Sequence, residues 1–330
     1  MMTIRDHQYG NETAYGIRNE ALRYTWAGYY LFVLASSLIG DTIILVASIK
    51  YGTFKIHKAI KVTIIHIAIC DLIMSFTDAL PKFVSIISSK WLFGQLLCDL
   101  TPYATYYLNL TSLFLVCNMT TIKLLILKYP LRSGMIPVRT TRVLCWLVAL
   151  TLPVTFFLVY VLDGQDSIEF SYRMYHCHYM VKSHIWNWLT PFLTVSFMFL
   201  PECMVVATTI WLLIEAKQVA RRGRESLKWQ GIVTTVLTAT VYCVSTLPYA
   251  VYYLGENMVT VDNHSQSFFH TSFYRLAIAA ISLNTISNFY IYSLSVQSFR
   301  DFIWSRMQQA YRLFNNTRTS TGLGRYGKSK

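Results

Sequence analysis

Seven long runs of apolar residues, separated by shorter polar segments, dominate this chain. A helix that crosses the hydrocarbon core of a bilayer needs roughly 20 mostly apolar residues. The runs that reach this length cover residues 26–49, 60–87, 98–127, 143–162, 186–214, 231–254 and 268–294. The pattern predicts an all-α protein, a seven-transmembrane helix bundle over residues 26–294 that follows a polar amino-terminal segment over residues 1–25.

The segment after the seventh run has a different periodicity. Its apolar side chains recur at helical spacing against Arg300, Arg306 and Arg312, and they are Phe299, Phe302, Ile303, Met307, Ala310, Tyr311 and Phe314. This pattern predicts a short amphipathic helix over residues 295–314 that lies on the inner membrane surface and contacts lipid. Residues 315–330 are rich in Ser, Thr and Gly and are expected to form a disordered cytoplasmic tail.

The composition agrees with a membrane protein. Of the 330 residues, 54% are hydrophobic and 14% are charged, whereas soluble domains carry about 25% charged residues. Met1 to Arg23 lacks the basic end and apolar core of a cleavable signal peptide. Nothing long remains for a separate soluble domain, and the protein is not expected to be an enzyme.

Basic residues collect in the links after runs one, three and five and in the tail. They include Lys50, Lys55, Lys58, Lys61, Lys128, Arg132, Arg139, Arg142, Lys217, Arg221, Arg222, Arg224, Lys228, Arg300 and Arg306. Because cytoplasmic links of membrane proteins carry an excess of Lys and Arg, these segments should lie inside and the amino terminus outside. Anionic lipid and acidic cytosolic partners then explain much of the net charge of +13, and no nucleic-acid partner is expected.

The predicted outside segments carry two further signals. Five of the seven cysteines lie deep within apolar runs, whereas Cys98 and Cys177 both fall on the predicted outer side of the membrane, where oxidising conditions favour a disulfide between them. Asn11 and Asn263 fit the glycosylation pattern on outside segments. His176 and His178 flank Cys177 without a further ligand partner, so no metal site is expected there.

Landmark residues recur in a fixed order through the runs. They are Gly40-Asp41, Asp71-Leu72, Pro81, Trp91-Leu92-Phe93-Gly94, Cys98, Ser112, Trp146, Pro153, Pro201, Leu247-Pro248, Asn284, Asn288, Tyr292 and Phe299-Arg300. In their joint order and spacing the chain resembles the rhodopsin-like (class A) G-protein-coupled receptors. The resemblance implies a multi-pass plasma-membrane receptor that binds an extracellular ligand and activates a heterotrimeric G protein, with arrestin as a further partner.

The inner end of the third run departs from this family. Counting from Cys98 and from Pro130 both place Ile122-Lys123-Leu124 where the family has Asp-Arg-Tyr. The resemblance implies that an acid restrains this basic residue, but here the neighbour is Ile122 and the position at the foot of run six is Lys228. We therefore expect either raised basal activity or lost coupling. The alternative is that Lys123 only extends its ammonium to the membrane interface.

Runs six and seven depart as well. Pro248 removes one backbone hydrogen bond and should act as a hinge, whereas Thr246 stands where the family has an aromatic residue under the ligand. Phe289 replaces the proline of the Asn-Pro-x-x-Tyr pattern before Tyr292. By resemblance, the residues expected to serve G-protein coupling are Lys123, Leu124, Tyr292, Arg221 and Lys228.

Asp41 and Asp71 lie at mid-membrane depth, where ionisable residues usually face the bundle interior and carry function. By resemblance, Asp71 belongs to a sodium and water network with Ser112, Asn284 and Asn288, and Asp41 adds a second carboxyl. Two close carboxylates disfavour double ionisation, so either a shared proton or a firmly held cation is expected. An ion-free interhelical hydrogen-bond network is the alternative; no other cofactor is expected.

For the ligand, the sequence mainly excludes classes. Thr105 occupies the position of the acid of amine receptors, and no Lys lies between Leu276 and Asn288, where a retinal receptor needs one. The candidate pocket residues are Thr105, Tyr106, Asn109, Tyr249, Tyr253, Ile278 and Ser282. The acidic and aromatic residues around Cys177 favour a short peptide slightly over a small molecule. Two alternatives stay open. One is a receptor-like protein that does not couple to a G protein, and the other is a channel or transporter subunit.

Overall fold

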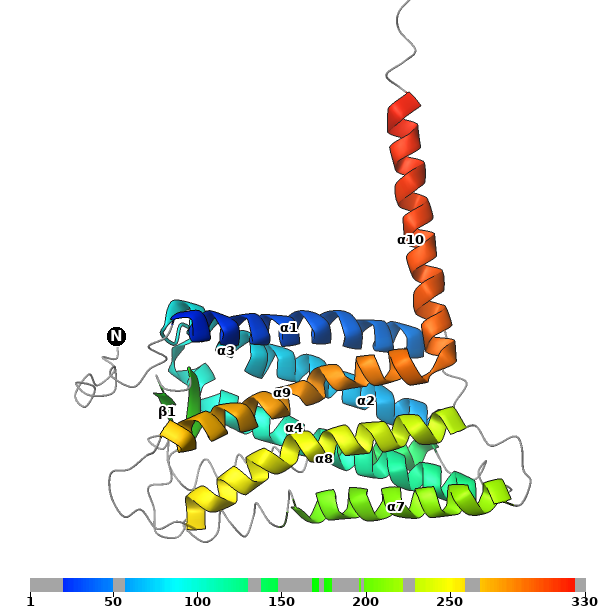
Figure 1. Ribbon diagram of the computed structural model, residues 1–330, viewed down its shortest axis with the longest axis horizontal. Coiled ribbons are helices and arrows are strands. Elements are labelled where there is room, and N and C mark those ends of the chain that lie inside the picture. The colour runs from blue at the N-terminus through cyan, green and yellow to red at the C-terminus, as the bar shows by residue number, and fades with distance from the viewer. Residues whose placement is uncertain are drawn as a thin grey trace, which may run out of the picture.

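The computed structural model describes residues 20–49, 57–129, 138–147, 168–171, 175–179, 196, 199–221, 229–258 and 268–323. Long helices run along a common axis, with a two-stranded hairpin at one end and helix α10 turning away from the bundle at the other (Figure 1). We call these the hairpin end and the α10 end.

The helices of the bundle match the apolar runs. Their bounds are α1 Glu20–Ile49, α4 Gly94–Lys128, α7 Leu200–Arg221, α8 Trp229–Met258 and α9 Phe268–Ser295. The second run forms α2 Lys58–Met74, the π-helical turn η2 Ser75–Ala79 and α3 Leu80–Ser88, which follow one another without a break. Within the described residues, five helical segments are long and apolar enough to cross a membrane.

Two helix boundaries differ from the sequence prediction. Helix α1 begins at Glu20 rather than at residue 26, because Glu, Ala, Leu and Arg are good helix formers that extend the helix beyond its apolar part. Helix α7 continues to Arg221, past the predicted end at residue 214. Residues 138–147 are helical, while most of the predicted fourth span and the start of the fifth lie outside the described residues.

The terminal helix α10 spans Gln297–Leu323. The predicted end at residue 314 and the predicted disorder of residues 315–323 are therefore wrong. No proline or glycine interrupts the chain between Gln297 and Asn315, and the first helix-weakening glycine is Gly322. Phe299 is fully buried and anchors the start of α10 in the bundle.

Side chains pack between the helices in several apolar clusters. One, at the α10 end, contains Ile44, Met119, Tyr292 and Phe299, and another in the middle contains Leu113, Val116 and Tyr242. Many large apolar side chains point outward instead, for example Leu31, Ile69, Val244 and Leu294. An outward apolar surface around a packed interior is what a bundle dissolved in lipid requires.

Candidate functional site

A short β-hairpin covers the hairpin end. Strands β1 Ile168–Ser171 and β2 His176–Tyr179 pair antiparallel, with Phe170 opposite Cys177. Cys177 forms a disulfide with Cys98 near the start of α4, with a Cα–Cα distance of 5.4 Å. This confirms the disulfide that the sequence predicts. The bond fixes β2 over the ends of the helices.

A small cavity lies beneath the hairpin, and we call it the inner cavity. Its walls are Lys82, Thr105, Tyr106, Asn109, Tyr249, Ile278 and Ile281. The structure therefore brings together five of the seven predicted pocket residues. Its volume is about 20 Å³, which is room for about one water molecule. A larger ligand requires the helices to separate.

The two remaining pocket predictions have different outcomes. Ser282 is buried below the inner cavity, where its hydroxyl donates to the carbonyl of Ile278 at 3.2 Å. It is not among the residues that line the cavity. Tyr253 lies on α8, but its side chain is outside the described part of the structure.

A buried ion pair forms the floor of the inner cavity. The Nζ of Lys82 lies 2.6 Å from Oδ1 of Asp78, and both side chains are 3% exposed. The hydroxyl of Thr105 donates to the same carboxylate at 3.0 Å, and Ser282 approaches its other oxygen at 3.4 Å. Asp78 therefore connects helices η2, α4 and α9. Asp78 itself belongs to the π-helical turn η2.

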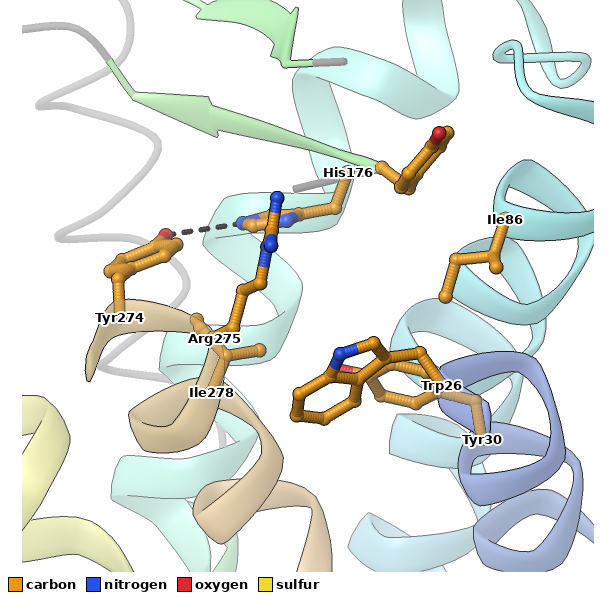
Figure 2. A pocket seen from close by; sticks show the side chains of 8 residues that line it. Trp26, Tyr30, Ile86, His176, Tyr274, Arg275 and Ile278 are labelled. Atoms are coloured by element: carbon orange, nitrogen blue, oxygen red, sulfur yellow. Dashed lines mark hydrogen bonds between the residues drawn. The ribbon is translucent and has the colours of Figure 1, made fainter. Parts of the chain in front are cut away.

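A second cavity, the outer cavity, lies between α1, α3, the hairpin and α9. Its walls are Trp26, Tyr30, Ile86, Tyr175, His176, Tyr274, Arg275 and Ile278 (Figure 2). Nε2 of His176 and the hydroxyl of Tyr274 are 3.1 Å apart and the two rings stack. Ile278 lines both cavities, and the Lys82 ammonium lies 5.5 Å from the centre of the Tyr30 ring. The two cavities are therefore neighbours.

Polar side chains form a network in the middle of the bundle. Ser37 donates to Oδ2 of Asp41 at 2.5 Å, and Ser75 donates to Ser37 at 2.6 Å and to the carbonyl of Asp71 at 2.9 Å. Asn288 donates to the Asp71 carboxylate at 2.9 Å. Helices α1, α2, η2 and α9 are thus joined through buried polar groups.

Within the described part of the chain, two buried oxygens of the network accept no hydrogen bond from a protein group. They are Oδ1 of Asp41 and Oδ1 of Asn288. Oxygen atoms are the ligands that hard cations prefer, so Asp71, Asp41 and Asn288 fit a sodium ion or ordered water. Ser112 is buried on α4, and Asn284 accepts a hydrogen bond from Ser245 of α8.

Helix α8 carries a second polar contact one residue further on. Pro248 lies inside this helix, and the Thr246 hydroxyl donates to the carboxylate of Glu202 on α7 and to the carbonyl of Tyr242. Thr246 is fully buried and Glu202 is 5% exposed. The residue that replaces the family's aromatic thus ties α8 to α7.

Near the α10 end, Lys123 bridges α4 and α8. Its ammonium donates to the carbonyl of Gly231 at 2.6 Å and to the hydroxyl of Thr235. Lys123 therefore does not simply extend to the membrane interface. We call this contact the Lys123 latch. It joins α4 and α8, as a contact with an acid at the foot of α8 would, but its acceptors are uncharged.

The other predicted coupling residues are less uniform. Leu124 is buried among Leu212, Ala216 and Ile232, so it packs between helices in this conformation. Tyr292 is 2% exposed and lies in the cluster at the α10 end. Arg221 is exposed at the last turn of α7. Lys228, Asn11 and Asn263 lie outside the described residues.

The substitution of Phe289 for proline has a structural counterpart on α1. A Cβ atom added to Gly40 would lie 2.6 Å from both Cβ and Cγ of Phe289. The missing side chain at Gly40 therefore lets α9 approach α1 with a large ring between them. The ring of Phe289 also packs edge-on against the ring of Phe299, with 6.2 Å between the two ring centres.

Among the residues that the structure describes, sequence reasoning missed the buried charges of Asp78, Lys82 and Glu202. Their signal was present, because Asp78 and Lys82 lie four residues apart within an apolar run, the spacing of neighbours on one helix face. Glu202 follows the landmark Pro201 inside another run. A charge within a membrane span is a functional-site hypothesis by default.

These features define a multi-pass α-helical membrane protein with a hairpin-covered cavity. The family model described as 7 transmembrane receptor (rhodopsin family) matches residues 42–292. The chain belongs to this family, so it is a receptor of the plasma membrane with seven transmembrane helices and not an enzyme.

Two relatives match parts of this chain. The chain is 26% identical to cysteinyl leukotriene receptor 1 of Mus musculus over 136 residues, 41% of this chain and 38% of that protein. It is 26% identical to melanopsin-B of Xenopus laevis over 110 residues, 33% of this chain and 20% of that protein. The matched segments thus span less than two fifths of each relative.

Proposed function

We propose that this receptor binds an extracellular ligand at the hairpin end and activates a heterotrimeric G protein at the α10 end. The observation that carries the proposal is that α8 contacts both sites. Tyr249 of α8 lines the inner cavity, and Gly231 and Thr235 of the same helix hold Lys123. A ligand that binds more tightly when α8 is displaced shifts the receptor toward that conformation. Because α8 also supplies the partners of Lys123, the same shift would open the latch.

The amino terminus is proposed to be extracellular. Support comes from basic residues at the α10 end, namely Lys58, Lys61, Lys128, Lys217, Arg221, Arg300 and Arg306, which the positive-inside rule places in the cytoplasm. Glycosylation at Asn11 and Asn263 would follow. Removal of glycans from wild-type receptor should increase its electrophoretic mobility, and the Asn11→Gln, Asn263→Gln double variant should show no such change.

A short peptide is favoured as the ligand, with a small molecule as the second candidate. The hairpin residues Tyr175 and His176 form part of the outer cavity wall, which suits a ligand that contacts the extracellular surface. An amine is disfavoured because Asp78, the acid beside Thr105, is already paired with Lys82. One relative is named for cysteinyl leukotriene, and this supports the small-molecule alternative.

The latch gives the sharpest test of coupling. Thr235→Val removes one hydrogen bond from the Lys123 ammonium and leaves Lys123 in place. Loss of one such bond, about 1.5 kcal/mol, should raise the ratio of open to closed receptor up to about tenfold. Basal second messenger in expressing cells should rise accordingly.

Two further variants complete this experiment. Thr238→Val is the matched control, because the Thr238 hydroxyl donates to the carbonyl of Thr234 in its own helix; its basal signal should equal wild type. Lys123→Ala removes the latch and the basic residue together and should abolish signalling. If the basal second messenger of every variant equals that of empty cells at matched surface expression, the result favours a receptor-like protein that does not couple. An ion current that needs no G protein would favour a channel.

We also propose three minor partners. Asp71, with Asp41 and Asn288, would hold a sodium ion that stabilises the closed bundle electrostatically. Helix α10 would lie on membrane lipid, since its exposed apolar side chains include Trp304, Met307 and Tyr311. Arrestin would bind at the α10 end, and its ligand-dependent recruitment to the membrane is the measurement.

A further inference from the structure

We propose that the inner cavity recognises a carboxamide group of the ligand, while the apolar remainder of the ligand lies in the outer cavity. The inference rests on the proposed receptor function and adds the chemical class of the ligand. It depends on a buried amide that has no protein partner among the described residues and on a neighbouring ion pair whose charges cancel.

Asn109 of α4 provides the buried amide. It is 3% exposed and lines the inner cavity. In the described part of the chain, its side chain makes no hydrogen bond with a protein group. An amide has two N–H donors and a carbonyl oxygen, and its burial without partners is unfavourable. A ligand group that both donates to Asn109 and accepts from it would satisfy this side chain.

Lys82 supplies a second donor to the same cavity. Its ammonium has three N–H groups and lies 2.6 Å from Oδ1 of Asp78. It also lies over the ring of Tyr30, 5.5 Å from the ring centre. These two contacts leave an N–H of Lys82 that can donate to the carbonyl oxygen of a ligand.

The charges beside the inner cavity favour a neutral ligand group. The Asp78 carboxylate and the Lys82 ammonium are in direct contact, so an ion of either sign would be attracted by one and repelled by the other. An ion would also lose its hydration on entering. A carboxamide is neutral and planar. It can exchange two hydrogen bonds with Asn109 while its oxygen also accepts one from Lys82.

The outer cavity receives the rest of the ligand. Ile278 lines both cavities. Trp26, Tyr30 and Ile86 present apolar surface in the outer one. The inner cavity measures only about 20 Å³, so a carboxamide needs the helices around it to separate, including α8 through Tyr249. Ligand binding would therefore favour a displaced α8.

The test uses full-length receptor in lipid nanodiscs and matched probes in three forms: primary amide, methyl ketone and free acid. One set contains N-acetylated dipeptides that end in Phe, Tyr or Trp, and the other contains aryl-propionic compounds with two rings. The ketone keeps the carbonyl group and replaces the amide nitrogen by a methyl group. Binding is measured as the shift in melting temperature with probe concentration, which needs no G protein.

We expect the amides of at least one set to bind about two- to tenfold more tightly than the ketones, because the ketone loses the hydrogen bond to Asn109. The acids should bind more weakly than the amides, because a charged group must be desolvated. Binding in the dipeptide set alone identifies an amidated peptide, and binding in the aryl set alone a small organic amide.

Variants of Asn109 assign this preference to one side chain. Asn109→Leu should make amide and ketone bind equally, since leucine offers the amide nitrogen no acceptor. Asn109→Ala replaces it if the leucine variant does not fold. Asn118→Leu is the matched control on the same helix, because Asn118 donates to Thr63 at 3.4 Å and does not line the inner cavity; it should keep the wild-type preference.

Three results would overturn the inference: ketones or acids that bind as tightly as amides, a preference for the amide that survives Asn109→Leu, or no amide that binds at about 1 mM in either set. The receptor function is judged separately. An amide that binds but never changes second messenger counts against coupling alone. An agonist whose response is unchanged by Asn109→Leu counts against the carboxamide alone.

Discussion

At the scale of single residues, the contact between Gly40 and Phe289 shows how one departure from the family is accommodated by a neighbour. The ring that replaces proline occupies the space that a side chain at residue 40 would need. Gly40→Ala forces the α1–α9 spacing to change, because the added Cβ would meet the Cβ of Phe289 as well as its ring. Overpacking of this kind costs about 1–3 kcal/mol, so we expect a lower melting temperature of the receptor in nanodiscs.

The same helix supplies the control for this variant. A Cβ added to Gly28 would meet nothing within 4 Å, so Gly28→Ala should leave the melting temperature unchanged or raise it slightly through helix propensity. Phe289→Ala added to Gly40→Ala should not restore the melting temperature, because the Cβ of residue 289 stays within 2.6 Å of the added Cβ. Equal effects of the two alanine variants would contradict the proposed close approach.

The buried ion pair of Asp78 and Lys82 should also contribute to stability. Lys82→Met leaves a buried carboxylate without its cation, and removal of one partner of a buried pair costs about 3–5 kcal/mol. We expect the Asp78→Asn, Lys82→Met double variant to melt above the Lys82→Met single variant. A double-mutant cycle of melting temperatures measures the coupling; additive effects would mean that the pair contributes nothing.

At the scale of elements, polar contacts hold helix α8 to both α7 and α4. The Thr246 hydroxyl donates to the carboxylate of Glu202 on α7, and this contact lies nearer to the hairpin end than the Lys123 latch does. Thr246→Val leaves the Glu202 carboxylate without this donor, which costs about 1–3 kcal/mol, whereas Thr246→Ser keeps the hydroxyl. We expect a lower melting temperature for Val only. A Ser variant as unstable as Val would show that the methyl packing matters instead of the hydrogen bond.

The elements were also the most predictable level of this structure. Bilayer thickness sets the length of a spanning helix, so apolar runs alone locate the described spans. The partners of Lys123 were not predictable in this way, because they are a carbonyl and a hydroxyl 108 and 112 residues away. Neither partner is charged, so a search for an acidic residue would not find it. In addition, packing decides which face of α8 points toward α4.

At the scale of the whole molecule, polar residues form successive levels between the two ends. The Asp78 pair lies below the cavities, the Asp41 and Asp71 network lies in mid-bundle, and the Lys123 latch lies near the α10 end. Sequence reasoning named Asp71, Asn288 and the α4 residues that line the inner cavity, because the family resemblance suggests these positions. It could not find Ser37 and Ser75, since serines in a helix are informative only when their neighbours are known.

The mid-bundle network should make the stability of the receptor depend on sodium. If Asp71, Asp41 and Asn288 hold sodium, replacing N-methylglucamine by sodium should stabilise the receptor in nanodiscs by about 1.4 kcal/mol at ten times the dissociation constant. Asp71→Asn should abolish this increase in melting temperature, because the amide lacks the negative charge. Ser48→Ala is a suitable control, since Ser48 is buried on α1 and its hydroxyl has no hydrogen-bond partner among the residues that the structure describes. A melting temperature indifferent to sodium in wild type and in Asp71→Asn would favour the ion-free network, in which Asp41 and Asp71 are satisfied by Ser37, Asn288 and water alone.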